Sequence, residues 1–228
     1  MGYREVNWSL PREQQVIHTR QNIYDGTWEK LPSMGWMFVP LTEYQGGGAA
    51  ATIEPLSEHL DHYRHMLESN LAVGVQACYR GPRLFDNEAT RTMVKGQVDW
   101  FKAHRDILES DLIHGRRADA RDLDWMLHVN PHLKEKGLLV VFNPLNEPVR
   151  KVLKPNVYYT GLTRAARLRE RGGKVQRLPV GRDGRVEVTV SVPAQGMNWW
   201  VMNQRNMVEG MRGHRLMIFF RLPWLHAR

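Results

Sequence analysis

The stretch Arg185-Val186-Glu187-Val188-Thr189-Val190-Ser191-Val192 decides the fold of the C-terminal part of this chain. Apolar and polar side chains alternate through it without a break, which predicts a β-strand with one buried and one exposed face. Asp183-Gly184 stands directly before it, and another alternating run, 174–180, precedes that turn. Because Asp-Gly is favoured in two-residue turns, we expect these two runs to pair as a hairpin.

The same short period extends backwards to about Asp124. Turn-forming pairs such as Asn143-Pro144 and Gly172-Gly173 separate the apolar runs. The further strands that we expect are 125–130, 138–142, 149–153, 157–162 and 199–202. A series of short strands separated by turns predicts an antiparallel β-sandwich or meander.

Before Asp124 the apolar residues recur at helical spacing. We expect helices over 11–24, 55–70 and about 88–108. Two short continuous apolar runs, 34–41 and 71–75, alternate with these helices and fit strands that are buried on both faces. This order of strands and helices predicts parallel strands, so the predicted fold class is α/β followed by all-β.

Composition and charge argue against several classes of protein. The net charge is +8, but half of it lies in 203–228, which holds five Arg and one Glu. No basic stripe with interleaved aromatic residues accompanies the rest, so we expect no nucleic-acid partner. No run of 18 apolar residues exists, so we expect no membrane association through a spanning helix.

Neither the N-terminus nor cysteine usage indicates a cellular compartment. The residues after Met1 lead into no hydrophobic region, so we expect no signal peptide within this chain. The single cysteine, Cys78, cannot form an internal disulfide. The sequence leaves open whether the parent protein is periplasmic or secreted.

Four segments, in their order along the chain, carry a resemblance to α-galactosidase-like glycoside hydrolases. That clan joins a (β/α)8 catalytic barrel to a C-terminal antiparallel β-sandwich. Met34-Gly35-Trp36-Met37-Phe38-Val39-Pro40, with the glycine-rich loop after it, is similar to a last barrel strand and its active-site loop. The segment 98–108 is similar to the last barrel helix, and Gly137-Leu138-Leu139-Val140-Val141-Phe142-Asn143-Pro144 and Tyr158-Tyr159-Thr160-Gly161-Leu162 resemble strand ends of the sandwich.

The resemblance covers most of this chain but only the end of a typical member. It implies that 1–110 is the incomplete C-terminal part of a (β/α)8 barrel, that 111–202 is an antiparallel β-sandwich, and that 203–228 is a tail to which we assign no role. The remainder of the parent barrel would then be a partner of this chain. The nucleophile of the enzyme would lie outside it.

Enzymes of this kind use two carboxylates, a nucleophile and an acid/base, on loops at the carboxyl ends of the barrel strands. The resemblance implies Glu5 as the acid/base and Trp8 as a stacking face for a sugar ring. The alternative is that Glu5 is an ordinary loop acid.

Four further side chains follow the two apolar runs. Glu43 and Tyr44 come after the first run, and Arg80 and Asp86 come after the second. If both runs are barrel strands, these side chains lie on the catalytic face, and we predict that they contact the carbohydrate substrate. The alternatives are a solvated acid at Glu43 and a structural ion pair between Arg80 and Asp86.

Neither a metal nor a cofactor is expected. His59, His62 and His65 follow one another at spacing three on one helix, which spreads them over roughly 120° of its surface. Ligands of one ion must converge more closely, so we expect a solvated helix face. Gly46-Gly47-Gly48 lacks the Lys and Ser or Thr of a P-loop.

The predicted function is therefore that of the C-terminal part of a retaining glycoside hydrolase for α-glycosides, inactive as this fragment. The alternative is a non-catalytic carbohydrate-binding or structural β-sandwich module with a helical lead-in. That alternative predicts that 110–202 folds alone and binds sugar on exposed Trp residues.

Overall fold

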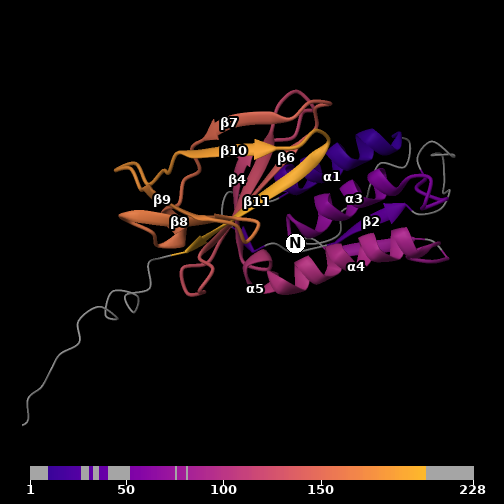
Figure 1. Cartoon of the computed structure of the whole chain (residues 1–228), viewed down its shortest axis with the longest axis horizontal. Coiled ribbons are helices and arrows are strands. Elements are labelled where there is room, and N and C mark those ends of the chain that lie inside the picture. Colours follow the sequence, from indigo (N-terminus) through magenta and orange to yellow (C-terminus); the bar gives the residue numbers. More distant parts are fainter. Residues whose placement is uncertain are drawn as a thin grey trace, which may run out of the picture.

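The computed structural model describes residues 10–26, 31–32, 36–40, 52–74, 76–80 and 82–203 of the chain. Helices α1, α3 and α4 gather on one side of the molecule and the antiparallel strands on the other (Figure 1). The predicted order, α/β followed by all-β, is confirmed. Most of the predicted tail 203–228 lies outside the described residues.

The N-terminal part contains two parallel strands and four helices in the described residues. The helices are α1 (Arg12–Gly26), α3 (Leu60–Leu71), α4 (Glu88–Ala103) and α5 (Arg105–Leu108). The strands β2 (Trp36–Pro40) and β3 (Gln76–Arg80) pair in parallel, with α3 between them along the chain; β2 lies within the predicted run 34–41. Asn87 begins α4 with a capping box, in which its side chain accepts from Thr90 N–H at 3.0 Å.

The strand predicted over 71–75 is wrong. Leu71 is the last residue of α3, a turn follows it, and β3 begins only at Gln76. Ala72 and Val73 are fully buried because they pack against the β-sheet, not because they belong to a strand. An apolar run of this length does not distinguish a buried helix end from a buried strand.

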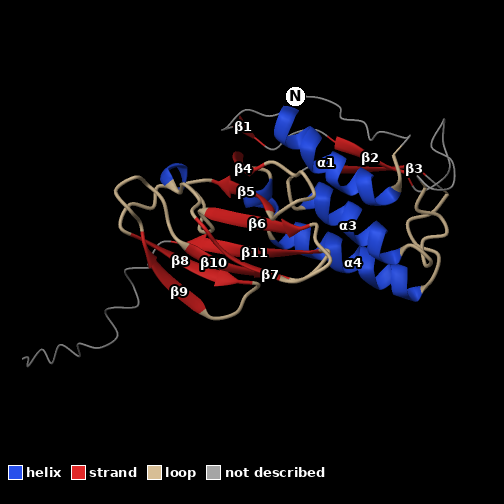
Figure 2. Ribbon diagram, turned by 90° about the horizontal axis from the view of Figure 1, so that it is seen from above, coloured by secondary structure: helices blue, strands red, loops and turns tan. Residues whose placement is uncertain are grey.

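The C-terminal part is a large antiparallel sheet covered by a small one. The large sheet has the order β1 (Leu31–Pro32), β4 (Asp111–Arg116), β5 (Asp124–Val129), β6 (Gly137–Asn143), β11 (Gly196–Asn203), β8 (Ala165–Glu170) and β9 (Val175–Pro179). The small sheet pairs β7 (Val149–Leu153) with β10 (Val188–Val192). Figure 2 shows these strands beside the helices α1, α3 and α4. The predicted β-sandwich is confirmed.

Three details of the predicted β part are corrected. The runs before and after Asp183-Gly184 do not form a hairpin, because β9 pairs with β8 whereas β10 pairs with β7. The segment predicted as a strand over 157–162 instead forms a 3-10 turn, η1 (Tyr158–Thr160), which ends at Gly161 with φ 73°. Three strands of the large sheet, β1, β4 and β8, were not expected.

The central strands β5, β6 and β11 of the large sheet are largely buried on both faces, and the two faces use alternate residues of each strand, whereas β9 at the edge is mostly exposed. On β6, Leu139 and Val141 pack in one core with β7 and β10. Leu138, Val140 and Phe142 pack in a second core with α5 and the end of α3. The described part of the molecule therefore has three layers: helices, the large sheet and the small sheet.

A buried ion pair joins the helical layer to the sheet. Arg20 of α1 donates to both carboxylate oxygens of Asp124 on β5, at 2.6 and 2.8 Å, and the side chains are only 4% and 3% exposed. Arg20 also donates to Ser69 Oγ of α3 at 2.9 Å and stacks on the Phe142 ring of β6 at 4.4 Å. The Arg20 side chain thus links α1 to α3, β5 and β6.

Removing one partner of this pair leaves the other charge buried without a counter-ion. We expect Asp124→Ala to lower the free energy of unfolding by about 3–5 kcal/mol. The control is Asp25→Ala, which breaks the half-exposed Arg117–Asp25 pair and should cost at most about 1 kcal/mol. Urea unfolding followed by tryptophan fluorescence measures both values. Equal decreases in the free energy of unfolding for the two variants would show that the buried pair stabilises the protein no more than the half-exposed pair.

Two glycines give opposite predictions. A Cβ on Gly115, at the bulge between His114 and Arg116, would lie within 3.0 Å of the Trp125 ring and carbonyl. Gly115→Ala should therefore destabilise the protein by about 1–3 kcal/mol. Gly96 lies inside α4 with nothing within 4 Å of the new atom, so Gly96→Ala should stabilise by about 0.5–1 kcal/mol. Thermal unfolding of the two variants tests the opposite signs.

Candidate functional site

The carboxyl ends of the two parallel strands define the candidate site. In the register of β2 and β3, Pro40 lies opposite Arg80, so both strands end at the same edge. Loops at the carboxyl edge of parallel strands are the usual place of active sites in α/β folds. We call this place the βα edge: the carboxyl ends of β2 and β3 with the described loop residues 52–59 and 82–87.

Two sets of polar contacts tie the loops of the βα edge together. Arg83 donates to both carboxylate oxygens of Glu54, each at 3.1 Å. The Ser57 backbone N–H and hydroxyl both donate to Asp86 Oδ2, at 2.8 and 2.9 Å. The Thr90 hydroxyl, at the start of α4, lies 2.9 Å from the other oxygen, Oδ1. The loop before α3 and the loop after β3 are thus held as one unit.

Asp86 is ionised in this arrangement. Its partial burial opposes the charge, but the hydrogen bonds from Ser57 and Thr90 outweigh that cost and lower the pKa of the carboxyl below its usual value. A carboxylate with these donors is well suited to hold a loop. It keeps lone pairs that can accept hydrogen bonds from a ligand hydroxyl.

The other predicted site residues are only partly placed. Glu5, Trp8, Glu43 and Tyr44 lie outside the described residues. Arg80 is the last residue of β3, at the βα edge, and its backbone alone is described. The described structure therefore brings the Arg80 backbone and Asp86 to the same edge and does not test the remaining roles.

Two exposed apolar side chains stand next to Asp86. Leu84 is 40% exposed and Phe85 is 45% exposed, in a loop whose Leu84 carbonyl accepts from the buried Tyr63 hydroxyl at 3.0 Å. The Arg91 guanidinium lies 5.8 Å from the centre of the Phe85 ring. Leu84 and Phe85 were not predicted as site residues, because one Leu-Phe pair in a loop has no periodicity to mark it.

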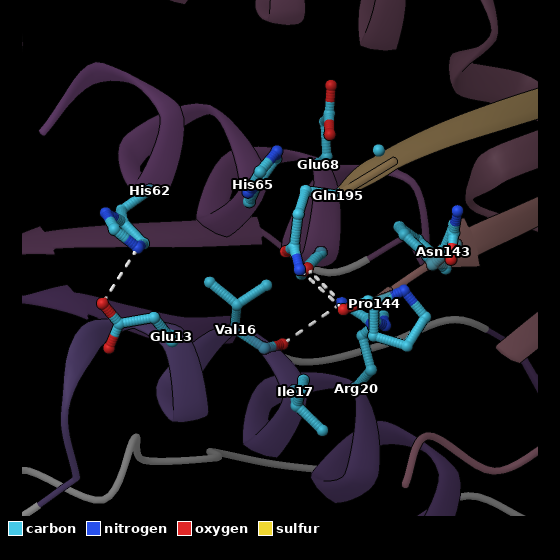
Figure 3. A pocket seen from close by; sticks show the side chains of 13 residues that line it. Glu13, Val16, Ile17, Arg20, His62, His65, Glu68, Asn143, Pro144 and Gln195 are labelled. Atoms are coloured by element: carbon cyan, nitrogen blue, oxygen red, sulfur yellow. Dashed lines mark hydrogen bonds and ion pairs between the residues drawn. The ribbon is translucent and has the colours of Figure 1, made fainter. Parts of the chain in front are cut away.

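A separate pocket lies between the helices and the β part. Figure 3 shows His62 and Glu13 facing each other across it, at 3.3 Å, with Arg20 and Gln195 at its other end. His65 and Glu68 also line it. The histidine face that was predicted to be solvated is therefore half-buried. Among the described residues no group of three or more potential metal ligands is present.

Burial shifts two groups of this pocket toward their neutral forms. It lowers the pKa of His65 to about 4, with the neighbouring Arg64 acting in the same direction. It raises the pKa of Glu68 to about 7, although Arg64 and Arg171 act against this shift. Glu68 accepts from Gln97 of α4 at 3.3 Å, so its carboxylate is directed to the neighbouring helix. We assign the pocket to the packing of the two layers and not to catalysis.

A buried histidine crosses the same interface. His128 of β5 is fully buried, and its Nε2 lies 2.9 Å from the Ala72 carbonyl at the end of α3. The carbonyl can only accept, so Nε2 carries the proton. Burial lowers the pKa of His128 to about 4, partly offset by this hydrogen bond.

Comparison with known proteins gives solved structures only. No protein-family model matches the chain, and no curated protein matches it. A putative α-N-acetylgalactosaminidase from Bacillus halodurans has 12% identity and a TM-score of 0.47, with 88% of this chain and 43% of that chain covered. The α-galactosidase I from Mortierella vinacea has 12% identity and a TM-score of 0.46, covering 83% and 44%.

A GH27 β-L-arabinopyranosidase from Geobacillus stearothermophilus is similar at 10% identity and a TM-score of 0.45, covering 86% of this chain and 42% of that chain. These three neighbours are glycoside hydrolases, the class of enzyme that the sequence motifs resemble. The chain spans less than half the length of each. Identities at this level concern the fold alone, and no residue role is taken from them.

Among the described residues no helix is long and apolar enough to cross a membrane.

The pKa of His128 predicts how stability depends on pH. Between about pH 6.5 and 4 the unfolded chain protonates this histidine while the folded protein does not, so stability falls as the pH falls through this window. His65 acts with the same sign, and Glu68 acts with the opposite sign from about pH 4.5 to 7. We expect His128→Gln, which keeps a side-chain N–H donor, to lose less stability than the wild type between pH 6.5 and 4.

Urea unfolding at a series of pH values measures this difference. The control is His132→Gln, which replaces an exposed histidine and should leave the pH dependence unchanged. Parallel curves for the wild type and His128→Gln would mean that His128 does not contribute to acid unfolding.

Proposed function

We propose that this chain is the C-terminal part of a retaining glycoside hydrolase that acts on α-linked galactosides. The reaction uses two carboxylates, one as nucleophile and one as acid/base. The parent enzyme would place them at the carboxyl edge of a (β/α)8 barrel, to which β2 and β3 contribute two strands. The remainder of that barrel is the implied partner, and an α-galactoside is the implied substrate.

The observation that carries this proposal is the βα edge itself. The parallel strands β2 and β3 end together, and their loops are joined by the Arg83–Glu54 and Ser57–Asp86 contacts. The same chain then continues through α4 and α5 into an antiparallel sandwich. Rigid loops at this edge are what substrate positioning requires, because small displacements of a reacting group are costly in rate.

Within this proposal each predicted site residue has a role. Glu5 donates the proton to the leaving oxygen and then activates water, and Trp8 stacks on the sugar ring. Glu43 and Tyr44 contact the substrate from the loop after β2. Arg80 acts from the end of β3 and Asp86 from the loop after it, which Asp86 also holds through Ser57.

The non-catalytic alternative has less support. Its carbohydrate-binding version predicts exposed Trp residues on the sandwich, but Trp200 is buried in one core, Trp125 packs against the same core, and Trp199 packs on Trp100 and His104. Trp125 and Trp199 are half-buried, so these contacts cover part of each ring. The carbohydrate-binding version of the alternative is therefore not better supported than the proposed function, and its structural version makes no prediction about these rings.

The proposal predicts that this chain alone does not turn over substrate. We expect no release of 4-nitrophenol from 4-nitrophenyl α-galactoside, because two of eight barrel strands cannot assemble both carboxylates. A longer reading frame that supplies further βα units before Met1 should hydrolyse the substrate with retention of the anomeric configuration, which NMR of the first-formed sugar measures.

In that longer protein Glu5→Gln should lower kcat by at least about 100-fold. The matched control is Glu187→Gln on the exposed face of the sandwich, which should leave kcat unchanged. Robust turnover by the isolated chain would refute the fragment interpretation. Full activity of the Glu5→Gln variant would refute the role of Glu5 alone.

A further inference from the structure

A second concave surface lies on the β part, apart from the βα edge. It is an open hollow between η1 and the turn that follows β9, lined on one side by Tyr158 and Tyr159 and on the other by 181–184. Leu162 and Val180 form part of its apolar lining. None of its lining residues belongs to the βα edge. We call it the tyrosine hollow.

Tyr158 is exposed to an unusual degree for an aromatic residue in this protein. It is 70% exposed, more than any other exposed large hydrophobic side chain in the described part of the chain. Its ring meets the Tyr159 ring edge to face, with centroids 5.2 Å apart and an angle of 82° between the planes. Such a contact supports one edge of the exposed ring and leaves a face open.

The backbone beneath Tyr158 is firmly held. The Tyr158 N–H donates to Asn156 Oδ1 at 2.9 Å, and the Val157 N–H donates to the Gly184 carbonyl at 2.8 Å. The buried Thr160 hydroxyl donates to the Val157 carbonyl at 2.6 Å. The backbone that carries the exposed ring is therefore held by hydrogen bonds on both sides of the turn. A ligand would meet a pre-organised surface.

The rim of the hollow offers polar groups with balanced charge. Arg182 is exposed and makes no hydrogen bond or ion pair with any residue that the structure describes. Asp183 accepts from the Arg185 backbone N–H at 3.2 Å and keeps its other oxygen 3.8 Å from the Arg185 guanidinium. One cation and one anion at the lining do not select for a phosphate or another strongly charged ligand. They supply donors and acceptors for hydroxyl groups.

We propose that the tyrosine hollow binds one pyranose ring of a neutral saccharide. The C–H face of the sugar lies on the open face of Tyr158, and its hydroxyls meet Arg182 and Asp183 at the rim. This combination of an aromatic platform and polar rim groups fits a sugar better than an apolar peptide, whose side chains can neither accept from Arg182 nor donate to Asp183. The site stands apart from the proposed catalytic edge and does not depend on the proposed function.

The full chain can be tested with methyl α-galactopyranoside and methyl α-glucopyranoside as probes, followed by amide chemical shifts in NMR. We expect saturable shifts at 156–163 and 181–184, with a Kd on the order of 1 mM for a single ring. Sorbitol carries hydroxyls without a ring face and should cause no saturable shift at these amides.

Three variants make the test specific. Tyr158→Ala should weaken binding by about tenfold or more, and Tyr158→Phe, which keeps the ring face, should stay within about threefold of the wild type. Val175→Ala removes another exposed apolar side chain and should leave Kd unchanged. Because Tyr158 is exposed, Tyr158→Ala should keep the wild-type spectrum outside the hollow.

Several results would overturn the proposal. They are the absence of saturable shifts with both glycosides at 50-fold the expected Kd, equal binding by the wild type and Tyr158→Ala, or shifts confined to 52–57 and 82–87. The last result would place the sugar at the βα edge. A sorbitol response equal to that of the glycosides would also contradict stacking on the ring.

Discussion

The arrangement of this protein depends on one buried guanidinium. Arg20 cannot remain charged inside the molecule unless its donors are satisfied, because transfer of an unpaired charge from water is far more costly than any single packing contact. The structure satisfies it with the Asp124 carboxylate, the Ser69 hydroxyl and the face of Phe142. These groups come from β5, α3 and β6, so α1 can dock in only one position relative to all three. Non-directional apolar burial alone would not impose that position.

Further contacts join the helices to the large sheet. His128 on β5 reaches the Ala72 carbonyl of α3, and Leu138 and Val140 of β6 pack in one core with the helices. A strand from the N-terminal part, β1, even pairs with β4 of the large sheet. A boundary between 1–110 and 111–202 remains a prediction about the organisation of the parent protein. Within the described residues the two parts are bound by shared burial and paired charges.

How much could be predicted differs from element to element. The alternation around Val188 and Val190 predicts β10 well, because one face of that strand is buried and the other is solvated. The strand β8 was missed because Arg167 and Arg169 mark its outward face and only Ala166 and Leu168 point into the core. The pairing of β10 with β7 depends on contacts between distant segments, which local turn chemistry at Asp183-Gly184 cannot reveal.

The candidate site shows the same limit. The sequence order predicts that Asp86 follows a parallel strand and belongs to the loop at its carboxyl end. It cannot predict that Ser57 and Thr90 are its hydrogen-bond partners, because Ser57 lies 29 positions away in the sequence. Tyr158 was noted only as part of a strand end. The 3-10 turn that exposes its ring follows from the tight chain reversal at Gly161, which no period of apolar residues signals.

The parallel strands β2 and β3 position the loops of the βα edge. Two parallel strands form a weaker unit than a wider sheet, and each keeps one unpaired edge within the described part of the chain. Here they are supported by α3, whose Tyr63, Met66 and Leu67 pack in a core with Ile53 and Leu56 of the loop at the βα edge. That core lies beside the strands and fixes their loops, but it does not pair the open edges. A barrel closes such edges by adding strands, and the proposed (β/α)8 barrel would cover the edges of β2 and β3 in this way. Under that proposal the βα edge is one sector of a ring of loops, and the nucleophile lies in a sector outside this chain.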